Sequence, residues 1–147
     1  MNFIKDNEHE VELKKLLLIA DKVILCSGWL FNDGMRLIED ALKTAISKNV
    51  PIVMYSSIQH TQKKEIKKFK KFSNFIHKTL SQETGKIHTK LYYFEHGNSF
   101  TAIVGSANIT KGGLIMNKEL SIKIKDLIGS ENHSEILNYI KSLEELS

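Results

Sequence analysis

The sequence predicts an α/β fold in which helices cover both faces of a mixed β-sheet. Two short apolar runs, Lys22 to Ser27 (KVILCS) and Pro51 to Tyr55 (PIVMY), are typical of strands that are buried on both faces. Between them, residues 34–48 carry apolar side chains at helical spacing. A strand, a helix and a strand in this order form a βαβ unit, whose strands are parallel and whose crossover is right-handed.

The next elements follow from the same two periodicities. Residues 10–20 are helix-like, with leucines at positions 13 and 16–18. Residues 88–94 (HTKLYYF) are rich in aromatic and β-branched side chains and predict a strand. Residues 99–104 (SFTAIV) can pair with that strand in antiparallel fashion through a tight turn at His96-Gly97-Asn98. Residues 120–124 predict a further strand, which makes the expected sheet a mixed one.

Two amphipathic segments complete the pattern. Residues 61–72 (TQKKEIKKFKKF) hold six lysines against the single Glu65, and Ile66 and Phe69 lie at helical spacing. We therefore expect a basic helix whose lysines face solvent. Residues 131–147 are acidic and carry an apolar stripe suited to packing or to dimer contact.

Length and composition bound the function. The 147 residues predict one domain spanning 1–147, with a net charge of +4 and one cysteine, Cys26, in an apolar strand. The sequence has no signal peptide and no apolar run of membrane length, so we expect a cytoplasmic protein with no membrane partner. Metal-ligand spacings are also missing, so we expect neither a metal ion nor another cofactor.

Residues 86–120 hold the pattern that is richest in chemistry. His88 and Lys90 are two apart, so on a strand their side chains project from the same face. Gly105-Ser106 ends the following strand, with Asn108 two residues on and Glu119 at the start of the next strand. A lysine and an asparagine can stabilise the charge of a phosphodiester, and a histidine suits nucleophilic attack or proton transfer. A carboxylate such as Glu119 can hold the histidine tautomer.

Taken singly, each of these residues is an ordinary surface or turn residue. As an ordered set, they resemble the HxK…GSxN signature of the phospholipase D superfamily, and the resemblance covers nearly the whole chain. It implies a phospholipase D-like fold and a phosphodiesterase with catalytic residues His88, Lys90, Asn108 and Glu119, the histidine acting as nucleophile. The family pattern has an aspartate five residues after the motif lysine, where this chain has Glu95, so the role of that position is open.

The number of motifs predicts an assembly. Most members of the superfamily build one active site from two copies of the motif, whereas this chain has a single H-x-K. The resemblance therefore implies a homodimer formed through the active-site face, as in the small bacterial nucleases of the family and the catalytic domain of its metal-independent restriction enzymes.

Candidate substrate-binding residues lie outside the motif core. Ser106 is at the strand end, and Lys63 and Lys67 belong to the basic segment, which has the charge expected of a partner for DNA or RNA phosphates or of a merely solvated surface. Trp29 follows the first buried strand at its carboxyl end, where α/β sheets place ligands. The sequence allows two interpretations of Trp29: its side chain lines the cleft and stacks on a base, or it covers the core.

Three function classes remain. The small size, the single motif and the basic segment favour a metal-independent endonuclease that cleaves DNA through a phosphohistidine intermediate at a site shared by two subunits. The alternative is the catalytic module of a larger restriction enzyme or helicase system. A lipid phosphodiesterase is the third class, but its known relatives are larger and carry two motifs.

Overall fold

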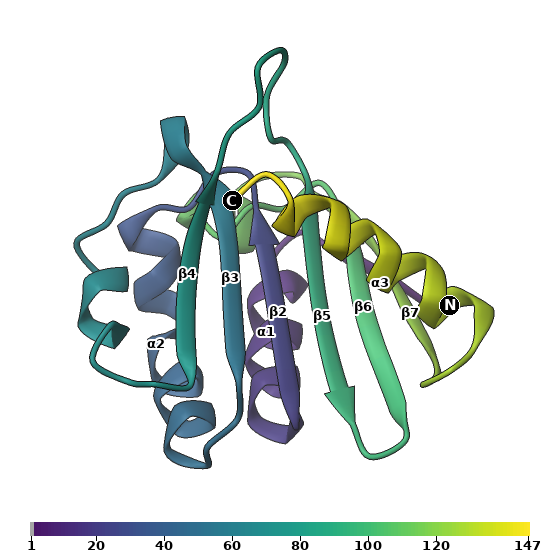
Figure 1. Ribbon diagram of the computed structural model, residues 1–147. Coiled ribbons are helices and arrows are strands. Elements are labelled where there is room, and N and C mark those ends of the chain that lie inside the picture. Colours follow the sequence, from purple (N-terminus) through teal and green to yellow (C-terminus); the bar gives the residue numbers. More distant parts are fainter. Residues whose placement is uncertain (1) are drawn as a thin grey trace.

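The computed structural model describes residues 2–147, which form one seven-stranded sheet with the strand order β1-β7-β6-β5-β2-β3-β4 (Figure 1). The strands are β1 (Asn2–Lys5), β2 (Lys22–Ser27), β3 (Ile52–Ser57), β4 (Phe75–Leu80), β5 (Lys90–His96), β6 (Ser99–Gly105) and β7 (Leu120–Leu127). The α-helices are α1 (Glu8–Ile19), α2 (Asn32–Ser47) and α3 (Glu131–Glu144), and three short helical segments are η1 (Ile58–His60), η2 (Ile66–Phe69) and η3 (Gly112–Met116).

The sheet is mixed, as the sequence predicts. β2, β3 and β4 run parallel to one another, and β2 to β3 is joined by α2 as the expected βαβ unit. β5 pairs antiparallel with β2 and with β6, and β7 pairs antiparallel with β6 and β1. The predicted turn between β5 and β6 is a two-residue hairpin, in which Gly97 has a φ of +61° that suits glycine.

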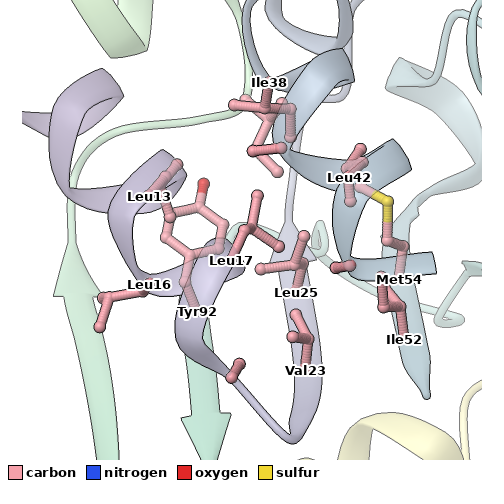
Figure 2. Close-up of a cluster of buried hydrophobic side chains, with 14 of the residues drawn as sticks. Leu13, Leu16, Leu17, Val23, Leu25, Ile38, Leu42, Ile52, Met54 and Tyr92 are labelled. Carbon is pink, nitrogen blue, oxygen red and sulfur yellow. The ribbon is translucent and has the colours of Figure 1, made fainter. Parts of the chain in front are cut away.

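Helices cover both faces of this sheet, which confirms the predicted layers. On one face α1 and α2 bury their leucine and isoleucine side chains against β2, β3 and Tyr92 of β5 (Figure 2). On the other face α3 lies across the strands (Figure 1) and contributes Ile140 and Leu143 to a second cluster with Tyr93 and Phe100. Neighbouring residues of β5 therefore serve opposite cores, because side chains alternate along a strand.

The predicted basic helix over residues 61–72 is wrong. Only η2, a single 3₁₀ segment, is helical there, although Ile66 and Phe69 are buried as expected. The chain at Thr61 and Gln62 is held extended beside Leu30, because the Gln62 N–H donates to the Leu30 carbonyl at 2.8 Å. Two buried residues three positions apart, such as Ile66 and Phe69, fit a single 3₁₀ turn as well as a longer helix.

Three elements have weak sequence patterns and were not expected. β1 has four residues, β4 is an edge strand with an exposed Ile76 and a polar His77-Lys78 pair, and η3 is a short π-helix rich in glycine. Edge strands have one unpaired side, so their sequences need not read as buried strands. No helix within residues 2–147 is long and apolar enough to cross a membrane.

Candidate active site

The residues of the motif lie together at one end of the central strands of the sheet. The carboxyl end of β2 lies beside the start of β5, where Ser27 pairs with Lys90. The carboxyl end of β6 lies beside the start of β7, where Gly105 pairs with Ser121. Because β2, β5, β6 and β7 are neighbours in the sheet, the residues at these strand ends lie close together.

His88 and Lys90 lie side by side, as their spacing predicts. The Lys90 Nζ is 2.9 Å from the His88 Nδ1 and donates to the His88 carbonyl oxygen at 2.6 Å. His88 is exposed just before β5 begins, whereas Lys90 is only 7% exposed. Burial lowers the pKa of the Lys90 ammonium, and the nearby charge of Glu119 opposes that change. The pair thus places a partly desolvated cation against an accessible imidazole.

This contact fixes the imidazole tautomer. A lysine ammonium has donors only, so the His88 Nδ1 must accept and the ring hydrogen of a neutral imidazole sits on Nε2. In this state Nε2 carries the ring hydrogen and has no free lone pair. It can attack an electrophile only after Lys90 releases Nδ1 and the proton shifts.

Asn108 is held by the loop that follows β2. Its Oδ1 accepts the backbone N–H of Trp29 at 3.0 Å, which leaves the donor side of the amide for another group. The Ser27 hydroxyl accepts the Ile109 N–H at 2.8 Å and donates to the Trp29 carbonyl oxygen. Sequence reasoning did not select Ser27, although its place at the carboxyl end of a buried strand was a usable signal.

Glu119 makes contacts other than the expected one. Its carboxylate accepts the Ser106 hydroxyl at 2.5 Å and the Asn117 side-chain amide at 3.2 Å. Within residues 2–147 it has no hydrogen bond to His88 of its own chain, whose Nδ1 contacts Lys90 instead. Ser106, expected at the substrate, is in this chain the partner of Glu119.

A second layer behind Glu119 comes from the N-terminal turn. The backbone of Glu119 is held on both sides, because its N–H donates to the Asp6 Oδ1 at 3.0 Å and its carbonyl accepts the Asp6 N–H at 2.9 Å. His9, 1% exposed, contacts the Asp6 carbonyl at 2.7 Å and the Ser121 hydroxyl at 2.8 Å. Neither Asp6 nor His9 carries a sequence signal, because their contacts join segments more than a hundred residues apart.

Gly28 allows two loops to touch at the site. Its N–H donates to the Thr89 carbonyl at 2.9 Å, and a Cβ there would lie 2.9 Å from the Ile87 carbonyl oxygen and 3.2 Å from the His88 Cα. A larger residue would push the His88 backbone outward, so the glycine is a steric requirement of the site. On the other side, a pocket between β5 and α3 borders His88, and the Tyr139 hydroxyl contacts the Thr89 hydroxyl at 2.6 Å.

The other residues that the sequence singled out lie at different distances from His88 and Lys90. Trp29 is 41% exposed on the loop that holds Asn108. Lys63 and Lys67 are exposed, Lys63 directly after Gln62 and Lys67 in η2. Glu95 lies near the far end of β5, where it accepts the Tyr93 hydroxyl at 2.7 Å and lies 4.0 Å from the Lys22 ammonium. It is therefore a structural residue at the opposite end of the strand from His88.

The described chain offers no obvious cation site. Among residues 2–147, no three histidine, cysteine, aspartate or glutamate side chains are grouped so that they could hold a metal ion. The Lys90 ammonium is a cation that the chain itself supplies beside His88.

Comparison with known proteins places this geometry in a family. The family model described as "Cardiolipin synthase, PLD-like domain" matches residues 14–143. NucT from Helicobacter pylori aligns over 99% of this chain and 95% of its own, with a TM-score of 0.75 and 18% identity. The phospholipase D family member Nuc from Salmonella typhimurium aligns over 99% and 93%, with a TM-score of 0.75 and 17% identity.

Phosphatidylserine synthase from Haemophilus influenzae aligns over 98% of this chain but 37% of its own, with a TM-score of 0.69 and 8% identity. No curated protein sequence matches this chain. At these identities the solved structures support the fold alone. The family model, which spans most of the chain, establishes membership: this chain belongs to the PLD-like domain family.

Proposed function

We propose that this protein is a metal-independent endonuclease, which cleaves DNA through a phosphohistidine intermediate at a site shared by two subunits. The observation that carries the proposal is the contact between the exposed His88 imidazole and the buried Lys90 ammonium, beside Asn108 and Glu119. A nucleophile in contact with a fixed cation is what attack on a phosphodiester anion requires.

The chemistry starts when a phosphodiester enters beside Lys90. A non-bridging oxygen competes with the His88 Nδ1 for the ammonium, and the Asn108 amide donates to the same phosphate. Once Nδ1 is released, the imidazole proton can shift to it, and Nε2 gains the lone pair that attacks phosphorus. The P–N bond forms as the bond from phosphorus to the leaving oxygen breaks.

The leaving oxygen needs a proton, which one histidine cannot supply while it attacks. His88 of a second subunit, related by a two-fold axis, provides it as an imidazolium, which gives its Nε2 proton to the leaving oxygen and becomes a neutral imidazole. Water then attacks the phosphohistidine, gives a proton to that second histidine and breaks the P–N bond. Two successive inversions give net retention of configuration at phosphorus.

DNA is the substrate that the surface charge favours. Lys63, Lys64, Lys67, Lys70 and Lys71 lie on one segment, and within residues 2–147 none of them has a carboxylate partner within 4.0 Å. Lys68, by contrast, is neutralised by Glu39 and Glu65. Such a run of free cations is suited to a phosphate backbone.

The first test is chelation. We expect cleavage of a plasmid to continue at an unchanged rate in excess EDTA, because the Lys90 ammonium supplies the charge that a divalent ion supplies in other nucleases. Phosphatidylcholine vesicles under the same conditions should stay intact. Loss of plasmid cleavage with EDTA, followed by recovery with magnesium, would exclude the proposed chemistry.

The second test concerns the shared site. If each site needs two His88 side chains, wild-type chains co-refolded with a ninefold excess of His88→Ala should leave about one dimer in a hundred with both histidines. The activity per wild-type chain should then fall about tenfold. The control is co-refolding with Lys86→Ala, which changes an exposed lysine two residues before His88. It should leave the activity per wild-type chain unchanged. An activity per wild-type chain that does not change with the excess would show that each subunit works alone.

A further inference from the structure

We propose that Phe31, Trp29 and His60 form an aromatic shelf on which an unpaired base beside the cleaved phosphate stacks, so that the chain prefers single-stranded nucleic acid to a duplex. The inference rests on the proposed function and deepens it by naming the substrate class. Its observations are the row of three rings, the contacts that tie the row to Asn108 and His88, and the free lysines that follow it.

The shelf is a continuous set of rings. The Trp29 ring stacks on Phe31, with centroids 5.6 Å apart and planes 24° apart, and it lies 5.0 Å from the His60 ring at 33°. Trp29 is nonetheless 41% exposed, so part of its apolar surface is turned to solvent. A large, partly exposed aromatic surface at the mouth of a polar site is suited to a planar, uncharged group.

Backbone hydrogen bonds hold the shelf in place. The Leu30 N–H donates to the His60 carbonyl at 3.0 Å, and the Gln62 N–H donates to the Leu30 carbonyl at 2.8 Å. These bonds join the loop after β2 to the segment after β3, which carry the rings. Because the rings are fixed before a ligand arrives, little ordering cost is left for binding.

The same loop touches the candidate catalytic residues. The Trp29 N–H donates to the Asn108 Oδ1 at 3.0 Å, and Gly28, one residue earlier, is pressed against the backbone at His88. A phosphate held by Asn108 and Lys90 therefore has its neighbouring nucleoside next to the shelf.

The charge pattern extends this path. Lys63 and Lys64 follow Gln62 directly, and neither has a carboxylate partner within 4.0 Å in the part of the chain from Asn2 to Ser147. A backbone that leaves the site over the shelf thus meets free cations next. Stacking aromatic rings beside a basic track is the general means by which proteins hold single strands.

The preference for a single strand follows from which bases can stack. In a duplex both faces of each base are covered by its neighbours, and a base must be unstacked before a protein ring can reach it. An unpaired base offers its face at no such cost, so the shelf favours only the single strand. One base stacked on one ring corresponds to about a tenfold gain in affinity.

The sole tryptophan of the chain allows a direct binding test. The experiment titrates full-length His88→Ala with a short oligothymidylate and records the Trp29 fluorescence, which requires no cleavage. We expect saturable quenching with the single strand, and little with a duplex or with an abasic oligonucleotide of equal length and charge. Equal quenching by the abasic strand, or none by any ligand, would overturn the shelf. If the Trp29 fluorescence changed with protein concentration and not with oligonucleotide, the rings would contact a second copy of the chain, and the proposal would also be overturned.

Cleavage rates give the second readout. Trp29→Ala should lower kcat/KM about tenfold more on the single strand than on a duplex, and Trp29→Phe should restore most of that difference. Phe3→Ala, which removes a 60% exposed aromatic side chain on β1 at the opposite edge of the sheet from β4, is the matched control and should change neither rate. Equal loss on both substrates would contradict the inference. If no variant cleaves anything, the proposed function fails, while the fluorescence titration still decides the shelf.

Discussion

Replacing His88 by alanine should reduce DNA cleavage by on the order of 10⁴-fold or more, the largest effect that we expect of any single substitution in this chain. The imidazole is both the attacking group and the proton donor of the proposed reaction, and no other side chain replaces it. The loss should appear in kcat, because the phosphate contacts of Lys90 and Asn108 remain.

The fold of His88→Ala should be intact, which separates a catalytic from a structural role. His88 is exposed and lies before β5, so the change in the free energy of unfolding should stay within about 0.5 kcal/mol. His96→Ala, at the other end of β5, is the control and should remain active. Free imidazole added to His88→Ala should restore part of the rate. An active His88→Ala enzyme would show that the histidine is not the nucleophile.

Lys90→Ala should lower kcat by about 10²–10³-fold, or about 2.7–4 kcal/mol of transition-state stabilisation. The effect is large because Lys90 is 7% exposed, so its charge acts on the phosphate with little screening by water. Lys86→Ala, which removes an exposed charge nearby, is the matched control. Equal rates for the two variants would mean that the charge is dispensable.

The pH dependence gives Lys90 a second signature. Only the ammonium stabilises the phosphate, so activity is present below the pKa of Lys90 and is lost as the pH rises through it. Burial lowers that pKa, so the alkaline loss should come at a lower pH than a solvated lysine would give. In Lys90→Arg, whose charge persists, any remaining activity should extend to higher pH.

The sequence was informative wherever a contact depends on local spacing. His88 and Lys90 meet as their spacing of two residues suggests, although β5 begins at Lys90 and not at His88 as expected, and β2, α2 and β3 form the expected unit because their patterns are strong. The contact of Ser106 with Glu119 depends on the pairing of Gly105 with Ser121, which no local pattern gives.

Contacts between distant segments explain the rest. Asp6 and His9 reach the site only because β1 pairs with β7, and a four-residue edge strand has too little pattern to be predicted. In the lysine-rich segment, by contrast, the local pattern is strong but predicts a helix that does not form. Its Ile66 and Phe69 are spaced for a helix, but the contacts of Thr61 and Gln62 with Leu30 keep the start of the segment extended, and only a turn and η2 follow.

The clamp between Asp6 and Glu119 makes the site depend on the completion of folding. The two residues are 113 positions apart, so the backbone of Glu119 is held on both sides only after β1 has paired with β7. Closing so long a loop is among the slowest kinds of contact formation, because the entropy cost comes before the gain. Partly folded chains would therefore carry His88 and Lys90 without an ordered Glu119. Recovery of activity during refolding should trail recovery of helix signal, and hydrolysis would serve as a reporter of the finished sheet.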